Sequence, residues 1–222
     1  MVVMYYGQNE EDRYIRAAFD GQTHGYFVDV GAYDGVKFSN TLLLEEQGWT
    51  GLCVEPHKVT FAKLKRKRQN SICVYGACVG DKTLTTAIYK DPGIVMLGGL
   101  APDEPTIRAN LTDAQGIEFR GYIETEVPAF TLNTLLLEHL GRGKTVDFVS
   151  IDTEGTELDV LRGFDLGLWI PRLLCVEHAH CDAVELEAYM ARMGYVMARV
   201  VGDNTFYANS YGMVDLVRSV VE

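Results

Sequence analysis

The feature that most constrains the fold is a short apolar run that ends in an acidic, glycine-rich turn, FVDVGAYDG at residues 27–35. Residues 26–30 predict a buried strand, and the glycines predict a tight turn into a helix. In an open α/β sheet, ligands bind in the crevice at the carboxyl ends of the strands, where the strand order reverses. We therefore expect a ligand site at this turn.

Short apolar runs alternate with amphipathic segments along the chain, which is typical of a mostly parallel sheet covered on both faces. Further strands are expected at residues 51–55, about 72–79, 146–151 and 173–176. Runs at 195–201 and 205–208, joined through Asp203 and Asn204, predict a closing antiparallel hairpin. The predicted fold class is α/β, with a doubly wound, Rossmann-like, mostly parallel seven-stranded sheet.

Helices are expected between these strands. They cover about residues 10–19, a segment capped at Ser39 and ended by Gly48, the segment after 51–55, about 132–139, and a segment ended by Gly163. Asp182 and Glu185 have the spacing of a capping box, for a helix that buries Leu186, Met190 and Met193.

Chain length and hydrophobic content favour one domain over residues 1–222, because 222 residues with 47% hydrophobic side chains bury one sizeable core. Residues 1–25 form its N-terminal helical segment. An extra β segment is expected at 83–90. Residues 91–118 contain six glycines and prolines between Pro92 and Pro105, both included, and they show little periodicity. We therefore interpret them as a lid or an insertion.

The chain is acidic, with a formal net charge of -11, which disfavours nucleic acid as a partner. The one basic run, at residues 63–68, is interpreted as a solvated helix face. Apolar runs are too short to cross a membrane, and the N-terminus becomes acidic too early for a signal peptide. Five cysteines without CxxC spacing indicate reduced thiols, so we expect a cytoplasmic protein without a membrane partner.

The turn lacks the spacing of a dinucleotide site, because Tyr33 and Val36 stand where G-x-G-x-x-G requires glycine. Asp29 and Asp34 suit an ammonium group and hydroxyls better than phosphates. Glu55, at the end of the second strand, can accept hydrogen bonds from ribose hydroxyls. A cationic cofactor without phosphates, S-adenosylmethionine, fits these residues.

Several strings resemble the FkbM-type methyltransferases: DVGAYDG at 29–35, SNT at 39–41, GWTG at 48–51, EP at 55–56, SIDTEGTEL at 150–158 and VEH at 176–178. The resemblance implies a class I methyltransferase fold and methyl transfer from S-adenosylmethionine to a hydroxyl, commonly on a sugar or natural-product scaffold. Two departures are Tyr33, where the family often has Asn, and the segment GQNEED at 7–12, which leaves Gln8 and Asp12 as pocket candidates. The resemblance and the turn together assign the cofactor to Asp29, Gly31, Tyr33, Asp34, Gly35, Ser39, Asn40, Glu55, Pro56, Cys78, Val79 and Asp81.

The reacting end of the site is expected at the ends of the fourth and fifth strands, with Asp152, Glu154, Glu177 and His178 as catalytic candidates. Glu157 and His180 are weaker candidates. Either His178 takes the hydroxyl proton, or Asp152 and Glu177 hold a divalent cation that acidifies the hydroxyl; proton abstraction without a metal is favoured. The acceptor is expected to be a small hydroxylated molecule. The alternatives are N-methylation and a catalytically silent protein that binds the cofactor.

Overall fold

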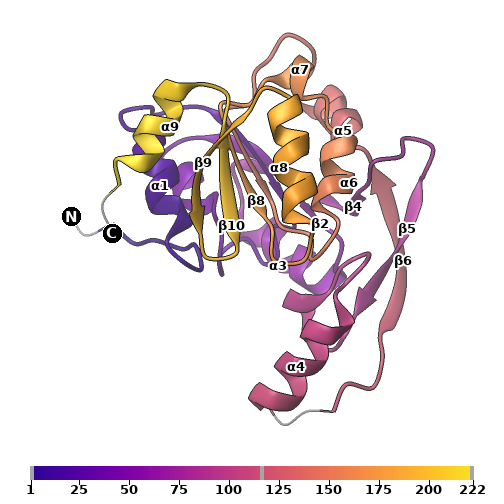
Figure 1. Ribbon diagram of the computed structural model, residues 1–222. Coiled ribbons are helices and arrows are strands. Elements are labelled where there is room, and N and C mark those ends of the chain that lie inside the picture. The colour runs from indigo at the N-terminus through magenta and orange to yellow at the C-terminus, as the bar shows by residue number, and fades with distance from the viewer. Residues whose placement is uncertain (1–2, 116–117, 221–222) are drawn as a thin grey trace.

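A seven-stranded sheet with strand order β3-β2-β1-β7-β8-β10-β9 runs through the centre of the molecule (Figure 1). The structure is a computed structural model that describes residues 3–115 and 118–220. Strands β1 to β3, β7 and β8 are parallel, and β10 runs antiparallel to both β8 and β9. The predicted doubly wound fold class and its closing hairpin are confirmed. The strands are β1 (Tyr26–Val30), β2 (Thr50–Glu55), β3 (Ser71–Tyr75), β7 (Phe148–Ile151), β8 (Leu173–Glu177), β9 (Val196–Val201) and β10 (Asn204–Ala208).

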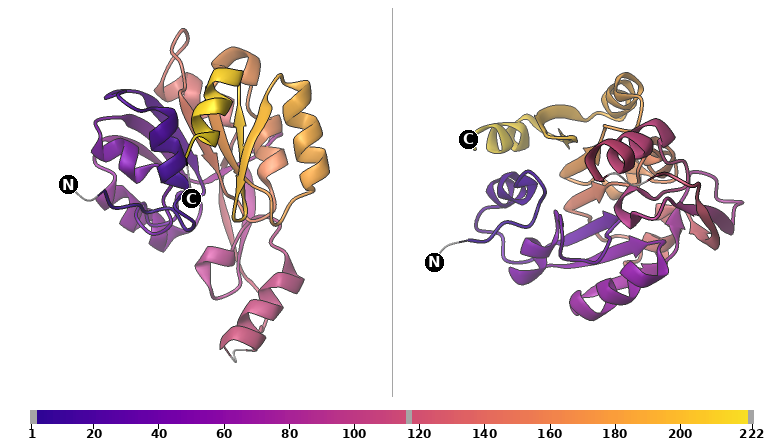
Figure 2. Two further views of the ribbon diagram at one scale, coloured as in Figure 1. Left: turned by 60° about the vertical axis from the view of Figure 1, so that its left-hand side comes forward. Right: turned by 90° about the horizontal axis from the view of Figure 1, so that it is seen from below.

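Helices cover both faces of this sheet, as the two views in Figure 2 show. Side chains alternate along β1, so that Phe27 packs into one layer and Val28 and Val30 into the other. Burial on both faces explains why the central strands are almost continuously apolar. The Phe27 layer contains α1 (Glu11–Ala18), α2 (Leu42–Glu46), α3 (Lys58–Lys67) and α9 (Tyr211–Arg218). The Val28 layer contains α5 (Leu132–His139), α6 (Glu157–Arg162), α7 (Leu166–Trp169) and α8 (Ala183–Arg192).

A second, three-stranded sheet of order β4-β6-β5 extends from the main body. It consists of β4 (Ala77–Cys78), β5 (Thr86–Asp91) and β6 (Ile123–Phe130). The strand expected at 72–79 is therefore split, since Gly76 has φ +151° and a Cβ there would lie 2.7 Å from the Pro128 oxygen. The chain leaves the main sheet at Gly76 and enters the second one.

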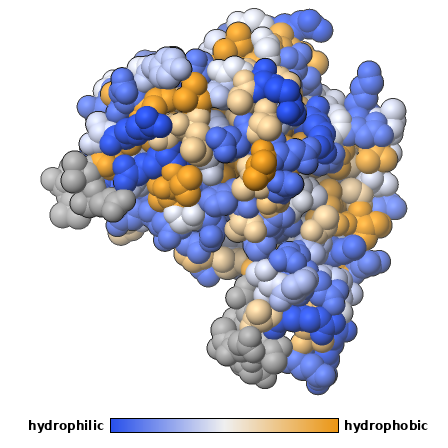
Figure 3. Space-filling view, in the orientation of Figure 1, coloured by the Kyte–Doolittle hydropathy of each residue, from blue (hydrophilic) through white to orange (hydrophobic). Residues whose placement is uncertain are grey.

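The segment between β5 and β6 forms an arm that projects below the main body (Figure 1). Sequence periodicity predicted little structure at 91–118, but the arm contains the 3-10 helix η1 (Val95–Leu97) and the helix α4 (Glu104–Gln115); residues 116 and 117 lie outside the described part. Ile107 and Leu111 of α4 are buried against Phe119 in a small cluster of their own. Hydrophilic side chains predominate on the described part of this arm in Figure 3.

Several local predictions were wrong. The helices α7 and α9 were not predicted, and α9 follows the hairpin that was expected to close the chain. Met193 was expected in the core but is 45% exposed, because it follows the last residue of α8. Asp182 caps α8 through the amides of Val184 and Glu185, but the Glu185 carboxylate pairs with Arg162, so the reciprocal half of the capping box is absent from the described hydrogen bonds.

The basic side chains at 63–67 are exposed on α3, but Arg68, which follows the last residue of the helix, is 1% exposed. Interpretation of the whole run as a solvated face was therefore wrong for this residue. Its guanidinium donates hydrogen bonds to Glu45 Oε2 at 2.6 Å and to Thr41 Oγ1 at 2.7 Å. None of the described helices has the length and apolar character required to cross a bilayer.

Candidate active site

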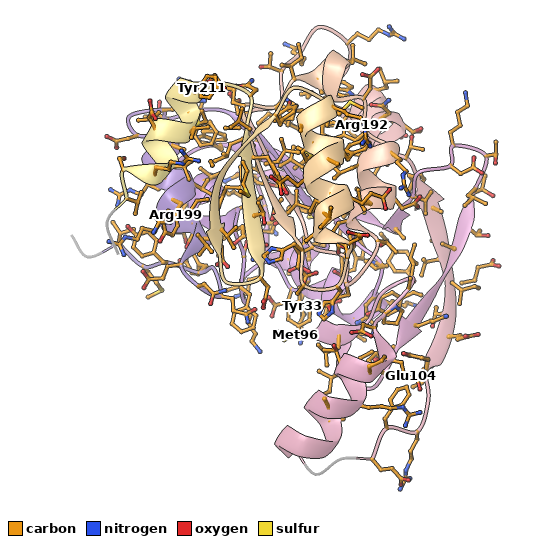
Figure 4. The ribbon with its side chains drawn as sticks, in the orientation of Figure 1. Tyr33, Met96, Glu104, Arg192, Arg199 and Tyr211 are labelled. Carbon is orange, nitrogen blue, oxygen red and sulfur yellow. The ribbon has the colours of Figure 1, made fainter. Side chains whose placement is uncertain are left out.

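An open cavity lies at the carboxyl ends of β1, β2, β7 and β8, with about 1170 Å³ of space between its atoms when the solvent at its mouth is included. Tyr33 and Met96, which both line it, lie below the strand ends in Figure 4. The cavity brings together most of the residues that the sequence predicted. These are Gln8, Asp29, Gly31, Tyr33, Ser39, Asn40, Glu55, Pro56, Cys78, Asp152, Glu154 and Glu177.

Eight other candidates do not line this cavity: Asp12, Asp34, Gly35, Val79, Asp81, Glu157, His178 and His180. Asp34 Oδ1 accepts hydrogen bonds from the amides of Val36 and Lys37 at 3.0 and 2.9 Å, which stabilises the turn itself. Asp12 accepts bonds from the amides of Tyr6 and Gly7. Asp81 accepts hydrogen bonds from the amide and the hydroxyl of Thr83. These carboxylates serve local backbone structure.

The glycine at the end of β1 brings two strand ends together. Gly31 has φ +85°, and a Cβ at this position would lie 1.7 Å from the backbone carbonyl oxygen of Asp152, the residue after β7. Its amide and the Ala32 amide each donate a hydrogen bond of 3.0 Å to the Val54 oxygen of β2. Only glycine allows this approach, and the three strand ends therefore form one floor for the cavity.

The β1 carboxylate is held in a buried polar network. Asp29 is 6% exposed, and its Oδ2 accepts a hydrogen bond of 2.5 Å from Thr41 Oγ1. Burial raises the pKa of Asp29, and the nearby Arg68 charge and the Thr41 bond oppose this rise. Arg68 also donates to Ser39 Oγ and to the Gly35 oxygen. The network fixes the turn and the start of α2 relative to β1.

The β2 carboxylate faces the cavity with one position for a further donor. Glu55 Oε1 accepts hydrogen bonds from the His57 amide and Thr60 Oγ1, and Oε2 accepts one from the Tyr33 amide at 2.9 Å. A carboxylate has about four acceptor positions, so Oε2 retains capacity for one more bond. Burial raises the pKa of Glu55 to about 7, although all three bonds oppose the rise.

Asn40 carries another acceptor at the cavity. Its Nδ2 donates to Ser150 Oγ at 3.1 Å, whereas its Oδ1 is buried and has no hydrogen-bond partner among the described residues. A buried acceptor without a donor is costly and is rare in native proteins. Asn40 Oδ1 is therefore suited to a donor on a ligand.

Acidic side chains crowd the ends of β7 and β8. Burial, followed by the charges of neighbouring carboxylates, raises the pKa of Asp152 and Glu177 above the usual carboxyl range and raises the pKa of Glu154 to about 9. Glu157 is fully buried and accepts bonds from the Thr153 amide, the Thr153 hydroxyl and the Gly155 amide. It thereby holds the turn that presents Glu154, whose own φ is +57°.

The histidine beside these acids is His180. Its Nε2 lies 3.4 Å from Glu154 Oε2 and 3.8 Å from Glu177 Oε1. His178 was the stronger sequence candidate, but its Nδ1 lies 3.1 Å from Thr205 Oγ1 on β10, and the residue is not part of the cavity wall. Neither histidine lines the cavity, but the turn after β8 places His180 against Glu154 and Glu177, which do line it, and places His178 against β10.

Sequence reasoning interpreted 91–118 as a lid or an insertion without naming residues there that reach the site, and it missed the contribution of β5. Tyr89, Met96, Gly98, Gly99 and Leu100 all line the cavity. A Cβ at Gly98 would lie 2.3 Å from Tyr89 Oη, and one at Gly99 would lie 2.7 Å from the Thr153 oxygen. The adjacent glycines at 98 and 99 were the available signal, since they let this segment approach the turn after β7 closely.

Comparison with known proteins agrees with this architecture. An FkbM methyltransferase from Methylobacillus flagellatus KT has a similar structure with a TM-score of 0.52 at 13% identity, over 84% of this chain and 44% of that protein. The present chain thus spans less than half the length of that relative. No curated protein matches the chain.

Two further solved structures are more distant. A TehB-like SAM-dependent methyltransferase from Corynebacterium glutamicum ATCC 13032 Kitasato has a TM-score of 0.48 at 10% identity, over 94% of this chain and 89% of that one. A SAM-dependent methyltransferase from Thiobacillus denitrificans, in complex with S-adenosyl-L-homocysteine, has a TM-score of 0.42 at 9% identity, over 89% and 68% of the two chains.

The family model described as "Methyltransferase FkbM domain" matches residues 29–197, which include the β1 turn, the Glu55 strand end and both acidic strand ends. This match covers well over half of the 222 residues. The chain therefore belongs to the FkbM family of methyltransferases.

Proposed function

We propose that this protein transfers a methyl group from S-adenosylmethionine to a hydroxyl of a small polar acceptor, such as a sugar, a glycoside or a natural-product scaffold. One observation carries the proposal: a single cavity joins hydrogen-bond acceptors at the ends of β1 and β2 to carboxylates at the ends of β7 and β8, and His180 lies beside two of these carboxylates. The first end suits the methyl donor. The second end suits an acceptor that must lose a proton.

The residues at the first end fit S-adenosylmethionine. The cofactor carries hydrogen-bond donors on its ammonium group, ribose and adenine, and this end of the cavity has acceptors in Glu55 Oε2 and Asn40 Oδ1 that await donors. Glu55 would hold the ribose hydroxyls, and Asn40 would accept a bond deeper in the cleft. Apolar wall residues, among them Val54, Pro56 and Leu100, would cover the uncharged parts of the cofactor. When bound, the cofactor supplies a methyl group on a positively charged sulfonium.

At the second end, the side chains must manage the proton of the acceptor. In the reaction a bond forms between the acceptor oxygen and the methyl carbon, the bond between that carbon and sulfur breaks, and the hydroxyl proton leaves. Glu154, Glu177 and His180 lie close enough together to contact one hydroxyl. They would remove its proton either directly or through a bound cation that acidifies the hydroxyl.

The acidic wall favours an oxygen acceptor over an amine. An amine beside these acids would take up a proton from one of them, and the resulting ammonium form, stabilised by the carboxylate, has no lone pair for attack on the methyl carbon. A neutral hydroxyl pays no such cost. A catalytically silent protein would bind the cofactor without turnover, and the labelling experiment described next detects that outcome.

The test is incubation of the purified chain with S-adenosylmethionine carrying a labelled methyl group and panels of sugars, glycosides, phenols and amines. The expected result is label in an ether linkage on a hydroxylated acceptor, with S-adenosylhomocysteine formed in equal amount. Label on nitrogen would overturn the O-methylation proposal. Failure to bind S-adenosylmethionine in calorimetry would overturn the assignment of the cofactor.

A further inference from the structure

We propose that Glu154, Glu177 and His180 form a binding site for a first-row divalent cation, of which Mn²⁺ is the representative, at the acceptor end of the cavity. The inference rests on the proposed function for the role of the cation, but the presence of the site does not depend on it. The sequence pointed only to Asp152 and Glu177 as metal candidates. The structure adds a histidine and a second carboxylate from the turn after β7.

The separations of the three side chains fit one ion. Each offers one ligand atom, and these atoms all lie within 4.8 Å of one another; His180 Nε2 is 3.4 Å from Glu154 and 3.8 Å from Glu177. Around an ion that binds its ligands at about 2.1 Å, adjacent ligand atoms lie about 3 Å apart and opposite ones about 4.2 Å apart. The cluster therefore needs only small side-chain adjustments to enclose a cation.

A second observation points to a missing ligand. Glu177 is 7% exposed and lines the cavity, and no described residue donates a hydrogen bond to its buried Oε2. Its neighbour across the strand ends is the carboxyl of Asp152, and a hydrogen bond between the two carboxyls requires that they share a proton. A cation bound by Glu177 would replace this proton and supply the positive charge that the described residues do not give to Oε2.

The other nitrogen of the histidine has the environment that metal-bound imidazoles have. A histidine that binds a metal through one ring nitrogen usually donates its other N–H to a carboxylate or a carbonyl. His180 Nδ1 lies 3.9 Å from Asp103 Oδ2, just before α4, and has no hydrogen-bond partner among the described residues. A small movement of Asp103 would complete this bond and connect the arm to the site.

The ligand types indicate which cations are suitable. Two carboxylates alone would suit magnesium or calcium, whereas an imidazole shifts the preference towards first-row transition metals. Mn²⁺ accepts both kinds of ligand. Three protein ligands leave coordination positions open, and an acceptor hydroxyl bound there would have a lowered pKa.

The experiment is titration of the purified full chain with MnCl₂, without cofactor or acceptor, followed through the electron paramagnetic resonance signal of free Mn²⁺. We expect one Mn²⁺ per chain and at least a tenfold loss of affinity in Glu177→Gln and His180→Gln. The matched control is His178→Gln, the same substitution two residues away, which should bind Mn²⁺ as the wild type does. Equal affinity in all four proteins, or no stoichiometric binding in the wild type, would overturn the site.

Wild-type protein alone provides a second measurement, which remains valid if a variant fails to fold. Pulsed electron paramagnetic resonance of the Mn²⁺-loaded chain should show coupling to an imidazole nitrogen, and its absence would overturn the assignment of His180. The proposed function is tested separately, by the methylation assay. Stoichiometric Mn²⁺ binding without any methylated hydroxyl would keep the site and overturn the function, whereas full methylation without Mn²⁺ binding would do the reverse.

Discussion

The Tyr33 amide donates a hydrogen bond of 2.9 Å to Glu55 Oε2, and this bond ties the turn after β1 to the end of β2. Tyr33 makes the bond from a left-handed backbone conformation, with φ +50°. Asn adopts this conformation more readily than most other residues with side chains, which gives a physical reason for the Asn that the family resemblance implies at this position. The bond leaves one acceptor position on Oε2, and the cofactor proposal depends on that position.

Glu55→Gln should weaken S-adenosylmethionine binding by about 1.5 to 3 kcal/mol, because it removes a charged acceptor from the cleft without removing volume. Calorimetric titration measures the effect. Glu126→Gln, an exposed carboxylate on β6, is the matched control and should bind the cofactor normally. Unchanged affinity in Glu55→Gln would remove Glu55 from the cofactor site.

Cofactor affinity should also depend on pH through Glu55, whose pKa is raised to about 7 by burial. Below this pH the free protein carries a proton on Glu55 that must be lost before the carboxylate accepts ribose donors. Affinity should therefore fall by up to about tenfold for each pH unit below 7 and reach a plateau above it. Calorimetric titrations over about three pH units, from about pH 5.5 to 8.5, should show that cofactor affinity depends less on pH in Glu55→Gln than in the wild type.

Arg68→Met should lower the free energy of unfolding by about 3 to 5 kcal/mol, because it leaves Glu45 and Asp29 buried without their cation. Arg66→Met on the exposed face of the same helix should change it by no more than about 0.5 kcal/mol. Urea denaturation followed by circular dichroism compares the two. Equal free energies of unfolding in both variants would show that the buried guanidinium gives the fold no net stabilisation.

Binding of S-adenosylmethionine and an acceptor should slow hydrogen exchange at residues 96–100, which line the cavity from the arm. The α4 amides should change less, since Ile107 and Leu111 already pack in a cluster of their own. Hydrogen exchange with mass spectrometry resolves the two segments. Identical exchange at 96–100 with and without ligands would contradict a lid role for this part of the arm.

The main sheet was predictable from the sequence because its strands are buried on both faces and are therefore nearly continuous apolar runs. The bounds of β1 were predicted without error. The helix α4 was missed because much of its surface is free of the main core, so its sequence lacks a strong 3.6-residue pattern. Arg68 was misassigned because its neighbours in the run are all solvated, and only the fold places Glu45 opposite it.

The candidate site was predictable only as far as strand ends determine it. Asp29, Glu55, Asp152 and Glu177 all lie within one residue of the end of a parallel strand, so their meeting at one edge of the sheet follows from topology. The choice between His178 and His180 depends on the path of the loop after β8. Loop direction is set by tertiary contacts, here those of His178 with Thr205 and of His180 with Glu154 and Glu177.

The excursion between β5 and β6 begins and ends at paired positions, since Asp91 lies opposite Ile123 in the ladder. A connection that leaves and returns at neighbouring points can change in length or sequence without moving either flanking strand. Among the residues that it adds to the cavity, Gly99 lies beside Thr153 and Glu154 at the acceptor end. The arm is thus an exchangeable module: grafting another connection between Asp91 and Ile123 would change acceptor choice while the donor half keeps its geometry.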